Sequence, residues 1–434
     1  MDDAVIQSYE KQAEALEGSV AGMDDLRAKA IKDFAAQGFP HAKAEDWRYS
    51  DLKTLRTKTY APANHAGETP DVPEAFTDCA ARFVFVNGRF SESRSDMGDL
   101  WQAASVRSLA NHFMANPDRA AELVRGRDGV GMLNTALAKD GMVIAVPAGV
   151  EIDDPVEIIH IMTGADDCAA HSRHIVELGE GASVHIVERF IGDDSAYWTN
   201  SMLQARVTES AVLHHTRLQE EGANAIHTTK AYVNVGAGGQ YHACNLSLGA
   251  KVGRFEAYVR LLSDESNATI DGVALAGTGQ SHDTLTHISH TMPHTTSDQI
   301  FRTVADSRGK TSFQGKVTVD KDAQKVEADQ SFKALVFDRT AEANAKPELE
   351  IFADDVKCSH GATVGDLDAK AIFYLTSRGI DPVTARQMLV EAFAAAALER
   401  IEIEPLRDAL MVRVGDWMAE RKAKPIPENK SRVE

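Results

Sequence analysis

The sequence is poor in cysteine, and its cysteines are not clustered. The 434 residues include only four, and no Cys-x-x-Cys motif occurs: Cys79, Cys168, Cys244 and Cys358. A disulfide framework or a zinc ribbon needs paired or clustered cysteines, so both are excluded. A reducing compartment such as the cytosol fits this cysteine usage best.

Long apolar runs and an excess of positive charge are also absent. No run reaches the roughly 18 apolar residues that a membrane span needs. The N-terminus, Met1-Asp2-Asp3, is acidic and lacks the apolar stretch of a secretory signal. The formal net charge is −19, from 46 basic and 65 acidic residues, which disfavours nucleic acid and anionic membranes as partners. We therefore predict a cytoplasmic protein that binds neither.

Motifs of nucleotide binding and of hydrolysis are missing as well. The sequence has no GxSxG elbow, no HExxH motif and no nucleotide-binding fingerprint. The glycine-rich segment 236–239 is not followed by Lys-Ser/Thr, and it indicates a turn between strands rather than a phosphate loop. The chain is therefore not expected to hydrolyse ATP by itself.

Residues 1–140 are predicted to form a mostly helical domain with one short strand-turn element. The apolar strand that begins at Phe83 runs into Asn87-Gly88, which is a strong signal for a tight turn. Trp47 and Tyr49 lie earlier, in a polar segment after two predicted helices. We expect these two aromatic residues to anchor a loop on the next domain.

Residues 141–375 are predicted to form a core of short strands that repeat at a regular step. The turn-then-strand units begin 29 residues apart, near Ala182, Ala211 and Gln240. The strands between them step by 28 or 29 residues, near Trp198, Ile226 and Phe255. Two strands per step without helices between them is the pattern of a β-solenoid. A β-sandwich also has many short strands, but the regular step favours the solenoid.

Residues 376–434 are predicted to form a helical domain that ends in a polar tail after about residue 421. Asp381 and Pro382 suit the N-cap and the first position of a helix. Six apolar side chains of this helix fall on one face: Ala385, Met388, Leu389, Ala392, Phe393 and Ala396. A second helix is expected from Pro405, with Leu406, Leu410 and Trp417 on a common stripe.

Cys358 and His360 are the strongest candidates for a functional site. They lie two residues apart in a segment with the pattern of a strand, so their side chains should project from the same face. A thiolate and an imidazole together suit iron, zinc or copper, or a thiolate activated by a neighbouring base. Lys357 and a protonated His360 would lower the pKa of Cys358. The pattern alone leaves open a buried, inert cysteine.

A cluster of histidines is a weaker candidate for a metal site. Four histidines fall within 13 positions: His282, His287, His290 and His294. His287 and His290 have opposite strand parity, and Pro293 interrupts the strand before the last member. We expect packed or interfacial histidines here rather than metal ligands. Of the adjacent His214 and His215, one should be buried and the other solvated.

Three longer segments resemble the SufB/SufD family of iron–sulfur cluster assembly proteins, and the resemblance covers most of the chain from about residue 38. The similarity is densest in Glu45–Leu52, in His294–Arg302 with Gly315–Val317 and Ala323–Lys325, and in Pro347–Ile351 through Asp355–Gly361 to Phe373–Ile380. The Trp-Arg-Tyr segment at residues 47–49 and the lack of an N-terminal cysteine cluster are of the SufD kind.

The resemblance implies a right-handed parallel β-helix core flanked by helical domains. It implies a SufB partner docked through the β-helix, and the ATPase SufC docked on the C-terminal helices from Asp381 to about Met418. Cys358 and His360 would lie at the SufB interface as ligands of a nascent iron–sulfur cluster, with His360 the stronger candidate beside a cysteine from SufB. The complex would also bind reduced flavin, at a site that no residue here marks.

The function that follows is a non-catalytic scaffold subunit that builds and transfers a nascent cluster and aids iron entry. Two alternatives stay open. One is a SufB-like scaffold that works as a homodimer. The other is a cytosolic β-helix enzyme that acts on carbohydrate through the carboxylates of Asp354 and Asp355, although the neighbours of this pair fit a metal-facing edge better.

Overall fold

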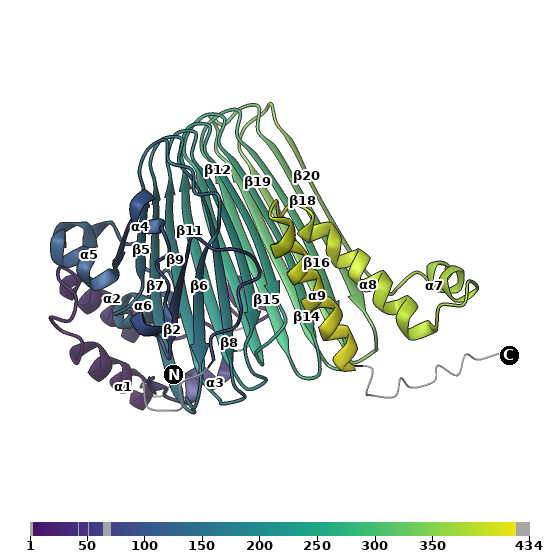
Figure 1. The fold of residues 1–434 in the computed structure, drawn as a ribbon, viewed down its shortest axis with the longest axis horizontal. Coiled ribbons are helices and arrows are strands. Elements are labelled where there is room, and N and C mark those ends of the chain that lie inside the picture. The colour runs from purple at the N-terminus through teal and green to yellow at the C-terminus, as the bar shows by residue number, and fades with distance from the viewer. Residues whose placement is uncertain (1–2, 42, 51, 64–70, 422–434) are drawn as a thin grey trace.

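Two ten-stranded sheets lie face to face and form the body of the molecule (Figure 1). The computed structural model describes residues 3–41, 43–50, 52–63 and 71–421. Helices gather at the N-terminal end of the sheets, and further helices lie along one sheet near the other end (Figure 1).

We call the two sheets sheet A and sheet B. The path of sheet A contains β19 (Glu342–Ile351), β17 (Lys310–Val319), β15 (Ser281–His290), β13 (Val252–Leu261), β11 (Ile226–Val235), β9 (Trp198–Val207), β7 (Cys168–Leu178), β5 (Met142–Val146) and β4 (Ser105–Ser108), with β1 (Ala61–Pro62) beside β7. Sheet B contains β20 (Lys357–Gly365), β18 (Glu327–Val336), β16 (Thr296–Ala305), β14 (Asn267–Ala276), β12 (Gln240–Ser247), β10 (Val212–Glu220), β8 (Ser183–Gly192), β6 (Val156–Met162), β2 (Ala81–Val86) and β3 (Arg89–Phe90).

The core is a parallel β-solenoid of about eight turns, as predicted. Strands that follow each other in the chain alternate between the sheets, and each pairs in parallel with the strand one coil earlier. Val212, for example, lies opposite Ser183 in the preceding coil and Gln240 in the next. Equivalent side chains therefore stack along the solenoid, and the inward rows form the largest apolar core.

The corners of the solenoid share a left-handed backbone conformation, although the residue types at these positions do not indicate it. Two residues before each strand from β8 to β18 in sheet B stands a residue with φ between +54° and +64°: Gly181, Ser210, Gly238, Glu265, His294 and Lys325. Only two of these six are glycine, although glycine is the residue that adopts this conformation most readily. His294 is thus a corner residue. The predicted turn at 236–239 is confirmed, since β11 ends at Val235 and β12 begins at Gln240.

Of the four clustered histidines, His282 and His290 are buried and His287 is half-buried, whereas His294 is exposed at its corner. His290 is fully buried, and its two ring nitrogens lie 2.8 Å from Thr295 Oγ1 and 2.9 Å from Ser297 Oγ. His215 is buried and contacts Glu188 and Tyr241, whereas the side chain of His214 is 17% exposed.

Most N-terminal helices pack at the start of the solenoid: α1 (Asp3–Glu14), α2 (Asp24–Gln37), α3 (Lys53–Thr57), α4 (Leu100–Ala103), α5 (Leu109–Ala115) and α6 (Gly129–Leu137). Short 3₁₀ turns cover Glu45–Trp47, Glu92–Arg94 and Pro117–Glu122. Helices α1, α2 and α6 share a core with Trp198 and Ile226 of sheet A. Because β2 pairs with β6, sheet B begins before residue 141, and the three predicted domain ranges stay a prediction.

Trp47 anchors the segment after α2 on sheet A, as predicted. Its ring is 3% exposed, and its Nε1 donates a hydrogen bond of 3.1 Å to Asp128 Oδ2. The guanidinium carbon of Arg254 lies 3.9 Å from the ring centroid, which is a close cation–π contact.

Replacement of this anchor should destabilise the protein strongly. We expect Trp47→Ala to lower the free energy of unfolding by about 3–5 kcal/mol, because it leaves a cavity and uncovers the buried Arg254. Tyr49→Ala, at a half-buried site, should cost about 1 kcal/mol or less. Urea unfolding of the two variants measures the difference, and equal midpoints would contradict the anchoring role.

The C-terminal helices α7 (Ala369–Thr376), α8 (Pro382–Leu398) and α9 (Glu404–Arg421) follow β20. Helices α8 and α9 lie on the outer face of sheet B, over strands such as β14 and β16, whereas α7 projects away from the body (Figure 1). The Asp381 carboxylate caps α8 by accepting from the backbone N–H of Val383 and Thr384, as predicted. The predicted polar tail at 422–434 lies outside the described residues.

The apolar face that the sequence of α8 shows is not the face that the helix buries. Of its six positions only Ala385 is buried, and Met388 is 43% exposed. The helix instead turns a neighbouring face towards sheet B, with Val390, Ala394, Ala397 and Leu398 buried. Because its second half is rich in alanine, little in the sequence distinguishes one face from the other. The stripe of Leu406, Leu410 and Trp417 in α9 is buried, as predicted.

A buried carboxyl group, Asp271 of β14, lies beneath the C-terminal helices. Its side chain is 2% exposed, accepts a hydrogen bond of 2.9 Å from the Ile300 N–H and lies 3.6 Å from Arg400. Burial raises the pKa of Asp271 to about 7, although Arg400 opposes the shift.

This raised pKa predicts a pH-dependent stability. The folded chain holds a proton between about pH 4 and pH 7 that the unfolded chain releases, so stability should fall as pH rises through that window. The loss should be roughly 2–4 kcal/mol, and Asp271→Asn should remove it. Urea midpoints at pH 5 and pH 8 test this, with Asp264→Asn at an exposed corner as a control that should keep the wild-type slope.

No helix among the described residues is both long and apolar enough to cross a membrane.

Candidate metal-binding site at the open end of the solenoid

The last coil of the solenoid has no further coil on top of it. Strand β19 pairs only with β17 and β20 only with β18, so within the described chain each sheet ends in an unpaired edge. Apart from Cys358, every residue of β20 is exposed. The interior of the solenoid is therefore open at this end, and its inward side chains are accessible.

Cys358 and His360 occupy inward positions of this open coil. They lie opposite Ala328 and Gln330 of β18, whose side chains are buried in the interior row. Cys358 is half-buried and packs against an apolar cluster that includes Ala328, whereas His360 is exposed. The site thus combines a partly shielded thiol with a solvated imidazole.

The expectation of a lowered thiol pKa was wrong. Burial and the charge of Asp329 raise the pKa of Cys358. Lys357, which was expected to lower it, lies on the opposite face of the strand and its Nζ is 2.6 Å from Glu327 Oε1. In the chain alone Cys358 is therefore a protonated thiol at neutral pH.

Two side chains do not complete a coordination shell. Their Cα atoms are roughly 6.6 Å apart along a strand, so both side chains must lean towards a shared ion. Among the described residues, no third His, Cys, Asp or Glu forms a ligand group with them. Iron and zinc usually take four or more ligands, so the remaining donors must come from outside this chain.

The acidic pair beside the site does not form a catalytic dyad. Asp355 makes an ion pair with Lys325, and its backbone N–H donates to Gln324 Oε1, so it fastens the last coil to the corner below. Asp354 is exposed. This arrangement gives no support to the carbohydrate-active alternative.

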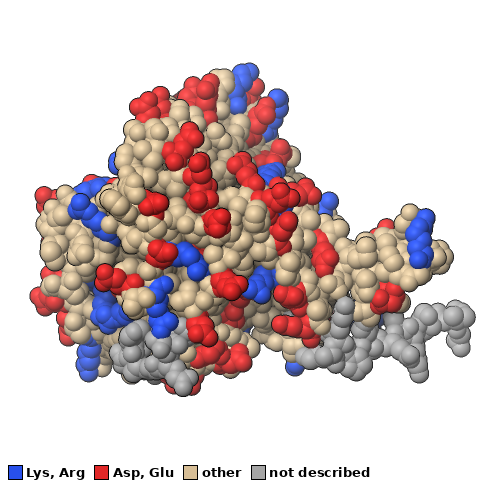
Figure 2. Space-filling view, in the orientation of Figure 1, with Lys and Arg blue, Asp and Glu red and all other residues tan. Residues whose placement is uncertain are grey.

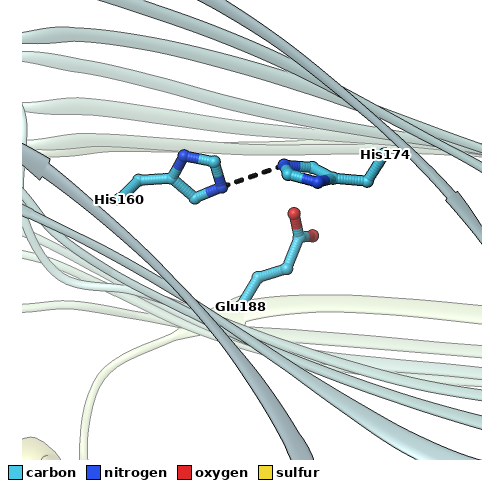
Figure 3. A group of neighbouring side chains, drawn as sticks. All are labelled: His160, His174 and Glu188. Atoms are coloured by element: carbon cyan, nitrogen blue, oxygen red, sulfur yellow. Dashed lines mark hydrogen bonds between the residues drawn. The ribbon is translucent and has the colours of Figure 1, made fainter. Parts of the chain in front are cut away.

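A second group of possible metal ligands lies inside the first coils, and it was not among the predicted sites. Figure 3 shows His160, His174 and Glu188, which are fully buried and present ligand atoms within 4.8 Å of one another. Burial lowers the pKa of His174 to about 4 and holds that of His160 well below its usual value, so both imidazoles are neutral. Only the strand parity of residues far apart in the chain could have indicated this group.

The hydrogen bonds of this group argue against a metal. The Met142 N–H donates to His174 Nδ1 at 3.1 Å, which leaves the ring proton on Nε2. That Nε2–H donates to His160 Nε2 at 3.2 Å, the contact drawn in Figure 3. Both facing nitrogens are thus already used, and a metal-bound histidine normally donates from its other nitrogen rather than accepting there. Glu188 is held by His215 and Arg217, so the group is a hydrogen-bonded core network.

The C-terminal helices carry exposed aromatic and apolar side chains. Phe373 and Tyr374 of α7 are 72% and 55% exposed, and Val383 and Met388 of α8 are also exposed. In Figure 2 the projecting segment, which is α7 in Figure 1, is mostly uncharged, although charged residues cover much of the remaining surface. Exposed apolar patches of this kind mark binding surfaces for other proteins.

The fold and the candidate site define a class of protein: an open-ended β-solenoid with a thiol and an imidazole on its last coil and an exposed apolar helix, α7, beyond it. Comparison with known families makes this specific. The chain matches the SUF system FeS cluster assembly SufBD core domain over residues 160–393 and the SufBD protein N-terminal region over residues 1–158. The chain belongs to the SufBD family of iron–sulfur cluster assembly proteins.

Individual relatives agree with this assignment. The chain is 31% identical over 392 residues to the iron–sulfur cluster assembly protein SufD of Escherichia coli, covering 89% of this chain and 90% of the relative. It is 28% identical over 433 residues to a SufBD family protein of Synechocystis, covering 94% of each. A chloroplastic protein of Arabidopsis thaliana is 29% identical over 416 residues, covering 91% of this chain and 88% of the relative. The predicted resemblance to SufD is thereby confirmed.

Proposed function

We propose that this chain is a non-catalytic scaffold subunit of a cytoplasmic SUF complex. It pairs with SufB through the open end of the solenoid and there offers Cys358 and His360 to a nascent iron–sulfur cluster. The ATPase SufC binds its C-terminal helices. The cluster is then passed on, and iron reaches it through the same interface.

The open last coil is the observation that carries this proposal. Unpaired strand edges are unstable in isolation and pair readily with another chain. Ile351, Phe352 and Val364 add exposed apolar surface at this end. A second solenoid stacked here would cover that surface and supply the missing ligands to the cluster.

The two candidate ligands would act differently in such an interface. His360 is solvated and ready to bind iron, which makes it the first ligand. Cys358 must lose its proton before it binds, and metal ligation supplies the driving force for that loss. Its shielded position delays ligation until the metal is already close.

The supply of energy must come from a partner, since the sequence carries no nucleotide-binding motif. SufC would transmit the state of its nucleotide to the interface through α7 and α8, which follow directly after β20. ATP can bias the interface only if one state of SufC binds these helices better than the other. Four free cysteines fit a reducing, cytoplasmic setting for this chemistry.

Co-expression of the chain with SufB and SufC tests the proposal. We expect one complex that contains all three proteins on size-exclusion chromatography. Separate elution of this chain would contradict the scaffold function.

The same unpaired edges also suit a second copy of this chain, which is the homodimer alternative. Light scattering of the 47.1 kDa chain, alone and with SufB, separates the two functions. If SufB converts any homodimer into a heterodimer, the scaffold function stands. A homodimer that excludes SufB favours the alternative.

A further inference from the structure

Beneath His360 lies a row of amide side chains that runs along the solenoid interior. Gln299 of β16 is opposite Gln330 of β18, and Gln330 is opposite His360 of β20. Side chains in such a row repeat about every 4.8 Å, the spacing between paired strands. His360 is therefore the outermost member of this row, and Gln330 is its direct neighbour.

Gln330 is buried, and its amide has no hydrogen-bonding partner. The residue is 3% exposed, and neither Nε2 nor Oε1 makes a hydrogen bond within the part of the chain that the structure describes. Gln299, one coil further in, differs because its Oε1 accepts from Thr286 Oγ1 at 2.5 Å. Buried amides in folded proteins nearly always have partners, so the Gln330 amide calls for one.

The surroundings of Gln330 limit where that partner can come from. Its Nε2 points across the interior towards Gly315 of β17, where an added Cβ would stand only 3.0 Å away. In the last coil the position above Gly315 is Pro347, which offers no hydrogen bond from its side chain or its nitrogen. In the last coil, the polar side chain that lies in the same row as Gln330 is therefore the imidazole of His360.

We propose that Gln330 Oε1 accepts the ring N–H of His360 and so holds the other ring nitrogen, with its lone pair, towards the open end. This inference rests on the proposed function of His360 as a cluster ligand. The hydrogen bond needs only side-chain rotations, because no hydrogen bond of His360 to the described residues has to break.

This arrangement makes Gln330 a positioning residue. Histidines that bind metal usually donate their second N–H to a nearby acceptor, which fixes the tautomer and the ring orientation. None of the carboxylates that the structure describes plays that role for His360, and the amide oxygen of Gln330 lies in the coil directly below it. Closure of the end by a partner subunit removes water as a competitor and strengthens the contact.

The tautomer of His360 in the isolated full-length chain is the direct test. Nitrogen NMR of ring-labelled histidine, with His360 assigned from its loss in His360→Asn, should show one protonated and one unprotonated ring nitrogen in mildly alkaline buffer. Gln330→Leu and Gln330→Asn, which remove or shorten the acceptor, should give averaged signals. Gln330→Glu keeps an acceptor oxygen at the same reach and should restore the fixed tautomer.

Gln299→Leu is the matched control, because it alters the same row one coil away from His360. It should leave the His360 signals unchanged. Averaged signals in the wild type, or a fixed tautomer in both Gln330→Leu and Gln330→Asn, would overturn the inference. Either result leaves the proposed function intact, since that function is tested by complex formation and by removal of His360 itself.

In the assembled complex the same variants give a second readout. Loss of the positioning contact should raise the iron concentration needed for half-maximal cluster formation by about ten- to a hundredfold, the usual effect of removing such a partner. The Gln330→Glu variant should stay close to the wild type. An unchanged iron requirement in Gln330→Leu would also count against the inference.

Discussion

A His360→Ala chain should still join SufB and SufC, but its complex should hold at least about tenfold less iron–sulfur cluster than the wild type. The imidazole is exposed, and the single hydrogen bond proposed for it, to Gln330, is worth about 1 kcal/mol, so the chain should stay folded without it. The lower cluster content of the variant complex would therefore report the loss of a cluster ligand and not a loss of folding. Iron and sulfide content per purified complex, together with visible absorbance, measure it.

Variants on the same strand separate ligation from general damage to the open end. Ser359→Ala changes the neighbouring residue on the opposite face, where its hydroxyl bonds to Asp329, and should leave the cluster content unchanged. Cys358→Ala should have a smaller effect than His360→Ala, because its thiol is shielded and protonated in the free chain. Wild-type cluster content in an intact His360→Ala complex would refute the assignment of this site.

Removal of both aromatic side chains from α7 should release SufC while the pairing with SufB persists. Phe373 and Tyr374 are the most exposed aromatic residues of the C-terminal helices. Exposed aromatic residues that become buried at an interface commonly contribute about 2 kcal/mol each, so Phe373→Ala with Tyr374→Ala should weaken SufC binding roughly a thousandfold. Affinity measurements with purified SufC give this number directly.

The control lies at the opposite end of the molecule. Trp101 and Met114 are 65% and 71% exposed and belong to the N-terminal helices, so Trp101→Ala with Met114→Ala removes comparable apolar surface. This variant should bind SufC as the wild type does. Equal weakening by both double variants would mean that α7 has no special role in docking.

The solenoid could be predicted because its turn-then-strand units recur at a regular spacing in the sequence. The orientation of the flanking helices could not be predicted. The steps of 28 or 29 residues fixed the coil length, and the register of Ser183, Val212 and Gln240 follows it. In α8 most faces carry alanine, so burial is decided by the shape of sheet B beneath it rather than by the helix itself.

The candidate site was predictable in part. Strand parity placed Cys358 and His360 on one face, which the register with β18 supports. The raised pKa of the thiol was not predictable, because it depends on burial against β18 and on the charge of Asp329, which lies near the thiol only once the coils stack. Gln330 was missed because its position next to His360 arises only when the coils stack. The reduced flavin expected from the family has no candidate residues and stays a prediction.

The uncovered coil also has a consequence for the balance of subunits in a cell. In a stacked repeat, each layer is stabilised mainly by its neighbours, so the terminal layer of a solitary chain opens most easily. Molecules made in excess of the partner subunit would expose a locally unfolded terminal coil and unpaired strand edges to proteases and to one another. We expect such unpaired subunits to be degraded or to aggregate, so that the two partner subunits must be synthesised in matched amounts.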